Sequence, residues 1–115
     1  MKTIEDLSNK IIAFRDARNW KQFHTPKDLS ISLVLEAGEV MEHFQWKTKR
    51  EVEEHIQNHK EDIADELADV FTYLLFMCDE LDINISDALE SKLNKSALKY
   101  PIEKSRGKST KYTEL

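Results

Sequence analysis

Two pairs of carboxylates, each pair spaced by three residues, stand inside largely apolar stretches of the sequence. Glu36 and Glu39 lie in "LVLEAGEVMEHFQW", and Glu66 and Asp69 lie in "EDIADELADVFTY". At about 100° per residue, each pair would occupy one face of a helix. Bulky apolar neighbours flank both pairs, which is not typical of a solvated face. Two helices that pack through their apolar sides would therefore bring four carboxylates into a small space.

Four adjacent carboxylates repel one another, and burial raises the pKa of each, so they need a counter-charge at neutral pH. A divalent cation would supply it. A ligand set made only of oxygens suits a hard ion, Mg²⁺ or Mn²⁺, better than zinc or copper. Mg²⁺ usually binds a few carboxylates together with substrate phosphates, which favours a phosphate-bearing substrate. Either pair alone would be typical of a solvated helix face, but the two together predict a metal site.

The competing metal site is a di-iron centre in a helical bundle. Such centres use Glu-x-x-His pairs from two helices, whereas the second member of each pair here is Glu39 or Asp69. His43, one turn beyond Glu39, is expected to be structural or to support the metal ligands. His55 and His59 lie in a charged connection and are expected to be solvated.

Helices are expected almost throughout, because the 115-residue chain is 34% charged and contains only two glycines and two prolines. Thr25, followed by Pro26, has the form of a helix N-cap. Thr48 and Glu51 match a capping box that starts a short helix in a polar connection, and Ser86 is the expected cap of the last long helix. The predicted long helices cover 4–20, 26–45, 61–81 and 87–99.

The apolar pattern of these helices predicts an all-α fold of the four-helix bundle type. The third long helix has a packing seam with steps of four and three: Ile63, Leu67, Val70, Leu74, Met77 and Leu81. The second is apolar on more than one face, because Ile31, Val34 and Met41 point away from its other apolar residues. A bundle this small cannot cover both faces, so we expect a homo-oligomer, a dimer or tetramer.

Length and composition indicate the domain organisation, the binding partners and the compartment to expect. The length and the 40% hydrophobic content predict one helical domain, 1–101, followed by a basic tail, 102–115, that is mobile unless a partner or ligand orders it. A net charge of -5 argues against binding to a nucleic acid polymer. Cys78 is the single cysteine, and no stretch approaches the roughly 20 apolar residues of a membrane helix. We therefore expect a cytoplasmic protein that binds no membrane.

The two carboxylate pairs, "EAGE" at 36–39 and "ELAD" at 66–69, resemble the E-x-x-E and E-x-x-D signature of the MazG-type all-α nucleoside triphosphate pyrophosphohydrolases. The blocks "NWKQFHTPKDL", "EHFQWK", "DVFTYL", "KYP" and "KYTEL" resemble the dCTP pyrophosphatase branch of that family, from about Arg15 onward. The resemblance implies hydrolysis of a nucleoside triphosphate, dCTP or a related deoxynucleotide, to the monophosphate and pyrophosphate. Such an enzyme would cleanse or balance the nucleotide pool.

By the same resemblance the four carboxylates hold Mg²⁺, which would neutralise the phosphates and activate a water for in-line attack on the α-phosphorus. Which glutamate orients that water stays open. The resemblance places four further side chains in the substrate pocket, where a base can stack for about 1–3 kcal/mol: Trp20, His24, Trp46 and Tyr73. Three lysines are expected either to meet the triphosphate as point charges or to form a solvated basic end: Lys92, Lys95 and Lys99.

Two positions depart from the dCTP pyrophosphatase branch. Ile11 stands where that branch has a histidine, and Ser96 stands where it has an asparagine. Both positions lie near the family's substrate, so the preferred base is left open. The alternative function from another class is a noncatalytic helical module that binds nucleotides or a partner protein.

Overall fold

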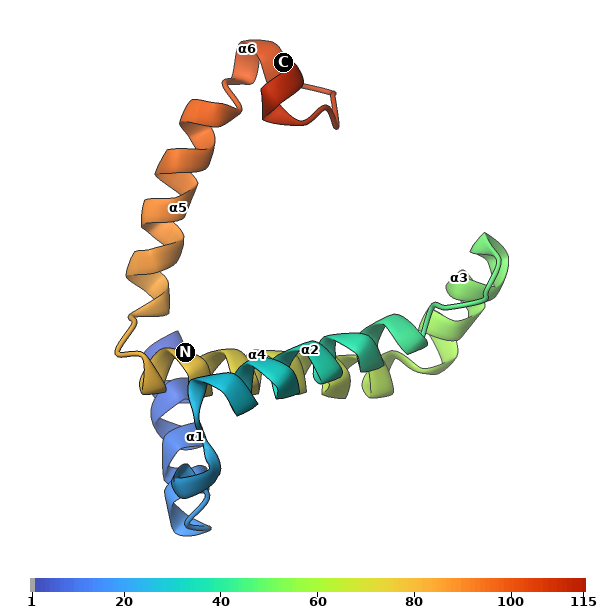
Figure 1. Ribbon diagram of the computed structural model, residues 1–115. Helices are drawn as coiled ribbons and strands as arrows, with labels where there is room; N and C mark the ends of the chain where they lie inside the picture. Colours follow the sequence, from blue (N-terminus) through green and yellow to red (C-terminus); the bar gives the residue numbers. More distant parts are fainter. Residues whose placement is uncertain (1) are drawn as a thin grey trace. The chain divides into compact units, whose positions relative to one another are not determined.

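The computed structural model describes residues 2–115, which are helical and contain no strand (Figure 1). The helices are α1 (Ile4–Ala17), α2 (Pro26–Glu42), α3 (Lys49–Asn58), α4 (Lys60–Glu80), α5 (Ile85–Lys99) and the short α6 (Ile102–Ser105), with 3₁₀ turns at Lys21–Phe23 and Tyr112–Glu114. None of the helices in this part of the chain is long and apolar enough to cross a membrane. The all-α prediction is confirmed. The chain forms two compact units, Met1–Ile83 and Asn84–Leu115.

Two of the predicted helix starts are confirmed. The Thr25 hydroxyl accepts a hydrogen bond from the Asp28 N–H at 3.2 Å, which caps α2. Thr48 and Glu51 form the predicted capping box at the start of α3, each side chain accepting from the other residue's N–H. Each cap satisfies backbone donors that lack a partner within the helix.

The prediction that Ser86 caps α5 is wrong. The cap is Asn84, whose side-chain oxygen accepts from the Asp87 N–H at 3.0 Å, and the helix already begins at Ile85. Asparagine and serine are about equally good N-caps, so local sequence did not distinguish two candidates that stand two residues apart.

The first two helices end about three residues before their predicted ends. After α1, Asn19 adopts the left-handed conformation with φ 54°, and the Trp20 N–H donates to the Arg15 carbonyl. After α2 the chain turns, and Trp46 is left-handed with φ 65°. Asparagine is enriched in that conformation, whereas a bulky residue is rare in it. The apolar pattern alone indicated neither helix end.

The core lies where α2 packs antiparallel along α4 (Figure 1), with α1 and α3 also in contact with α4. Within residues 2–115, the buried apolar residues are Leu29, Leu75 and Phe76. The predicted seam on α4 is therefore only partly right, because Leu67 and Leu81 are exposed. The prediction supposed that α4 packs against other helices along a single face. In the structure, α1 and α2 both cover the C-terminal part of α4.

An ion pair joins α1 to α4. The Arg15 side chain is buried, donates from Nε to Asp16 at 2.9 Å, and donates from its terminal nitrogen to Asp79 of α4 at 2.8 Å. Burial alone would lower the pKa of Arg15, but the hydrogen bonds and charges of the two aspartates outweigh it and raise that pKa. The guanidinium therefore stays charged inside the fold and depends on its two acceptors.

The outer face of α2 is apolar and uncovered. Val34 is 69% exposed, and Ile31, Leu35 and Met41 are exposed as well. The predicted second apolar face of α2 is thus present in the structure, while the oligomer expected from it stays a prediction.

The second unit contains α5 and the residues beyond Pro101. The Tyr112 ring lies edge-on to Tyr100 at 5.9 Å between centres, and the Lys99 ammonium stands 4.6 Å from the centre of the Tyr112 ring. These contacts fold the chain after α6 back on the end of α5. The expected division into a domain, 1–101, and a mobile tail, 102–115, stays a prediction.

We predict that Asp79→Ala lowers the free energy of unfolding by about 2 kcal/mol, because it removes a charge-assisted hydrogen bond and leaves the buried Arg15 with one acceptor. Urea denaturation followed by circular dichroism measures the change. The control is Asp65→Ala, at an exposed position of the same helix, which should stay within about 0.5 kcal/mol of the wild type. Equal stability of the two variants would contradict the structural role of this ion pair.

Candidate active site

Two helices contribute the four carboxylates predicted from the sequence. Glu36 and Glu39 stand on α2, Glu66 and Asp69 stand on α4, and one carboxylate oxygen from each lies within 4.8 Å of the others. We call these four residues the carboxylate cluster. The side-by-side packing of α2 and α4 creates it, because residues three apart on each helix face the partner helix.

Two members of the cluster have buried oxygens that lack a partner. Glu36 and Glu66 are half-buried, and the Oε2 atom of each is buried without any hydrogen bond, while Glu39 and Asp69 are exposed. Leaving a buried acceptor unsatisfied costs about 1–3 kcal/mol, and more for a charged group. A cation coordinated between the helices would satisfy both oxygens, so the residues present fit a hard divalent metal ion.

The electrostatics of the cluster agree with this fit. Burial raises the pKa of Glu36, and the neighbouring carboxyls of Glu39 and Asp69 raise it further. The pKa of Glu66 rises to about 7, first because it can share a proton with Glu39, then through burial and the charges of the cluster. A positive ion at this place would reverse these shifts, because it stabilises the ionised carboxylates.

Three of the predicted substrate residues lie toward the C-terminal end of α4 and the segment that leads into α2. The His24 ring packs against Phe76 at 4.6 Å between centres, and Tyr73 packs edge-on against the same ring at 5.8 Å. Trp20 lies edge-on to Phe14 at 5.7 Å and is partly exposed. Their stacking on a base stays a prediction, since each also packs within the fold.

The Nδ1 atom of His24 is buried and has no hydrogen-bond partner. Burial lowers the pKa of His24, and the charge of Arg15 lowers it further. The ring is therefore neutral at neutral pH and offers one donor and one acceptor nitrogen.

The remaining predicted substrate residues are Trp46 and three lysines. Trp46 follows the C-terminal end of α2, the end away from His24, and is 91% exposed. The three lysines predicted to meet the triphosphate are on α5, in the second unit: Lys92, Lys95 and Lys99. Trp46 therefore does not lie with Trp20, His24 and Tyr73, and the roles of Trp46 and the lysines stay predictions.

The expectation that His55 is solvated is wrong. His55 is half-buried, its Nε2 lies 2.8 Å from Nδ1 of His43, and its ring stacks on His59 at 4.5 Å between centres. His59 is exposed, but it is paired with Asp62, whose carboxylate is 3.2 Å from its Nδ1. Burial is the main cause that lowers the pKa of His55, followed by the charge of Lys47.

His43 and His55 line a cavity next to the carboxylate cluster. A cavity of about 450 Å³ opens between α2, α3 and α4. Its walls are three carboxylates and these two rings: Glu39, Glu42, His43, His55 and Glu66. Two of the five belong to the carboxylate cluster, so the histidines line the space directly beside it. The sequence signal for this was the single turn that separates His43 from Glu39, and it did not indicate the contact with His55.

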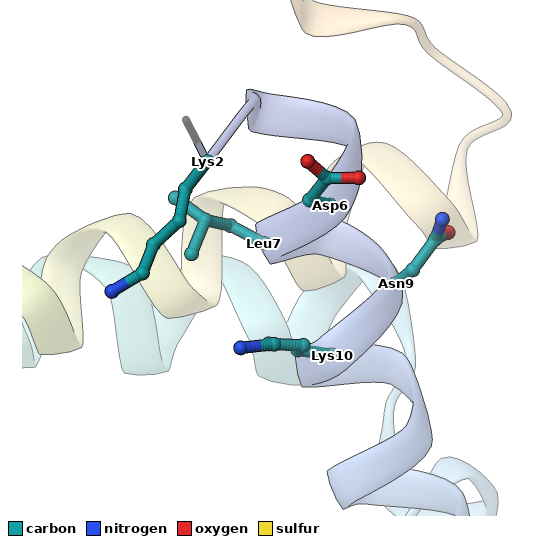
Figure 2. Close-up of a pocket in the computed structure, with 5 residues that line it drawn as sticks. All are labelled: Lys2, Asp6, Leu7, Asn9 and Lys10. Atoms are coloured by element: carbon teal, nitrogen blue, oxygen red, sulfur yellow. The ribbon is translucent and has the colours of Figure 1, made fainter.

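A larger depression, of about 710 Å³, lies on α1 and includes no member of the carboxylate cluster. Figure 2 shows its five lining residues, Lys2, Asp6, Leu7, Asn9 and Lys10. The Asp6 carboxylate already accepts the Thr3 N–H in the capping box of α1. Exposed lysines beside a helix cap do not make a catalytic site, so the chemistry is assigned to the carboxylate cluster.

We predict that Glu66→Gln stabilises the metal-free protein more at pH 8 than at pH 5. The folded-state pKa of about 7 lies above the ordinary 4.5. Between these values the native state binds more protons than the unfolded state, so the contribution of Glu66 to stability falls as the pH rises. Glutamine does not ionise, so the variant does not lose stability in this way as the pH rises.

Thermal melts in excess chelator at pH 5 and at pH 8 measure the effect. The quantity compared is the melting temperature of the variant minus that of the wild type at each pH. The control is Asp65→Asn, which removes a carboxylate outside the cluster from the adjacent position of α4. A difference for Glu66→Gln that is the same at pH 5 and pH 8 would show that the carboxylates do not interact as described.

Comparisons with known proteins agree with this geometry. Residues 31–115 match the model of the MazG-like family. The chain is 37% identical to dCTP pyrophosphatase 1 of Rattus norvegicus and to that of Homo sapiens, over 98% of this chain and 68% of each relative. The crystal structure of a pyrophosphatase from Archaeoglobus fulgidus DSM 4304 superposes with a TM-score of 0.81 at 39% identity, over 88% of this chain and 94% of that one. The chain belongs to the MazG-like family.

Proposed function

We propose that this protein is a Mg²⁺-dependent nucleoside triphosphate pyrophosphohydrolase that converts dCTP, or a related deoxynucleoside triphosphate, to the monophosphate and pyrophosphate. The observation that carries the proposal is the carboxylate cluster, whose two buried oxygens lack any partner. The relatives named dCTP pyrophosphatase 1 support the reaction and the substrate. Clearing deoxynucleotides from the nucleotide pool is the role that this reaction fits.

The donor set favours Mg²⁺, with Mn²⁺ as the alternative. All four groups of the cluster are carboxylates, and hard ions with oxygen ligands prefer such a site. When bound, the ion would supply positive charge that neutralises the phosphates and lowers the pKa of a water.

The members of the cluster have different exposures and therefore different tasks. The inner oxygens of Glu36 and Glu66 face the space between the helices and would hold the cation. Glu39 is the exposed glutamate of the cluster, and it also lines the adjoining cavity. It can therefore hold the attacking water and accept a proton from it.

The base of the substrate would lie toward Tyr73 and His24. The Tyr73 ring offers a stacking surface, and the neutral His24 offers a donor and an acceptor to the edge of a base. A noncatalytic module that binds nucleotides is the rival function, and it would use the same surface without any need for the carboxylate cluster.

The first prediction of this proposal concerns products. Purified protein mixed with dCTP and Mg²⁺ should yield dCMP and pyrophosphate, and dCTP should stay intact when a chelator replaces the metal. Chromatography of dCTP and the other common nucleotides under both conditions measures the reaction and ranks the bases. Binding of nucleotides without turnover would favour the noncatalytic module.

Glu36→Gln should reduce Mg²⁺-dependent turnover by about 100-fold or more, because it removes a ligand from a site that stabilises developing charge. Its helical circular dichroism should equal that of the wild type. The matched control is Asp65→Asn, exposed on α4 outside the cluster, which should turn over at close to the wild-type rate. Full activity of Glu36→Gln would exclude the assigned metal site.

We further propose that the protein is a homo-oligomer, a dimer or tetramer, built on the outer face of α2. Four exposed apolar side chains lie on this face: Ile31, Val34, Leu35 and Met41. Burying them against a second copy would remove apolar surface from water, which is the main driving force of such association.

Light scattering at micromolar concentration should therefore give at least twice the monomer mass, and Val34→Glu should reduce the mass to that of the monomer. The control is Lys27→Glu, an exposed polar position on α2. A monomeric wild type would contradict the assignment of this face.

A further inference from the structure

The carboxylate cluster lies between two other groups of side chains along α4. Toward the C-terminal end of the helix stand Tyr73 and His24, the proposed base end. Toward its N-terminal end stands the histidine pair, by which we mean His43 and His55, joined to the start of α4 by His59. At about 1.5 Å per residue, roughly 10 Å of helix separates Glu66 from Tyr73.

This order sets the direction of a bound nucleotide. The reacting α-phosphate must lie at the carboxylate cluster, where metal and water are held. If the base extends toward Tyr73, the β- and γ-phosphates extend the other way, into the cavity of about 450 Å³ that the histidine pair lines. The same cavity would hold the pyrophosphate that leaves.

The histidine pair keeps one N–H donor that is not used between the rings, whichever way the shared hydrogen points. If His55 Nε2 carries the hydrogen between the rings, His43 carries its own hydrogen on Nε2. If His43 Nδ1 carries it, His55 carries its own hydrogen on Nδ1. In both cases the neutral pair has one outward N–H donor and one outward acceptor.

No other side chain of the cavity wall supplies such a donor. The remaining wall residues are carboxylates, Glu39, Glu42 and Glu66, which accept hydrogen bonds when ionised. A phosphate oxygen needs donors, and two of these carboxylates already belong to the carboxylate cluster. The free imidazole N–H of the pair is therefore the wall group that suits a polyphosphate.

The ring of His55 is also held in place before any ligand arrives. His43 fixes one edge by the 2.8 Å hydrogen bond, and the ring of His59 stacks on one face. His59 is in turn oriented by Asp62 at 3.2 Å. A donor fixed in this way loses little side-chain freedom on binding, which strengthens its contribution.

We propose that the histidine pair, His43 and His55, is a binding site for the two distal phosphates of the nucleoside triphosphate and for the pyrophosphate released from it. This inference rests on the proposed function and adds the residues that bind the leaving group. It assigns the pair a binding role, with no proton transfer.

The test measures the binding of pyrophosphate and of dCMP separately, each with Mg²⁺, by isothermal titration calorimetry. His55→Leu should weaken pyrophosphate binding by about tenfold, the loss expected for a hydrogen bond to a charged group. Its affinity for dCMP should stay within twofold of the wild type, because dCMP lacks the distal phosphates. His55→Gln, which keeps an N–H donor, should recover part of the loss.

The matched control is Gln57→Leu, at an exposed position of α3 that is not part of the cavity wall. It should bind pyrophosphate as the wild type does. Unchanged pyrophosphate affinity in His55→Leu would overturn the inference, as would an equal loss of dCMP affinity, which would move the histidines to the base or the α-phosphate.

A second measurement needs no variant and keeps the inference testable if His55→Leu does not fold. In ¹⁵N spectra of the wild type, the imidazole signals of His43 and His55 should shift on addition of pyrophosphate with Mg²⁺ and stay in place with dCMP. Unshifted signals with pyrophosphate would overturn the inference. A wild type that hydrolyses no nucleotide would instead overturn the proposed function, so the two failures are distinguishable.

Discussion

The structure depends on a conflict between packing and charge where α2 meets α4. The apolar sides of these helices can be buried only if Glu36 and Glu66 go partly into the interface with them. Like charges held this close raise one another's pKa and oppose the packing. The core formed by Leu29, Leu75 and Phe76 offsets that repulsion. The interface is thus less stable than it would be without the carboxylates, which is typical of a functional site.

The parts of the fold that the sequence predicted are those governed by local rules. Helical periodicity placed both carboxylate pairs on the α2 and α4 faces that meet, and side-chain hydrogen bonds set the starts of α2 and α3 at Thr25 and Thr48. Helix ends were less predictable. They depend on left-handed residues such as Asn19 and Trp46, and such a conformation is not evident from residue type when the residue is a tryptophan.

The features that the sequence did not predict depend on which helices pack against each other. The burial of Leu75 and Phe76 in place of Leu67 follows from the contact of α1 with the C-terminal part of α4, which Arg15 and Asp79 hold together. His55 appears solvated in the sequence because charged residues surround it on α3. Only the fold of α3 back toward the end of α2 brings it to His43. Contacts between distant residues of this kind are not encoded in any local pattern.

The distribution of charge along α4 connects the structure with the chemistry. The centre of the helix carries the negative charges that a metal ion would neutralise, while the rings on either side, His24 and His55, have lowered pKa values and stay neutral. Fixed charges are present near both rings, because Glu42 lines the cavity beside His55 and the charge of Arg15 acts on His24. The neutral rings themselves offer N–H groups without adding a further charge to either place. They can hydrogen-bond a nucleotide at its base and at its distal phosphates while leaving the charge at the reacting phosphate to the carboxylate cluster and its metal.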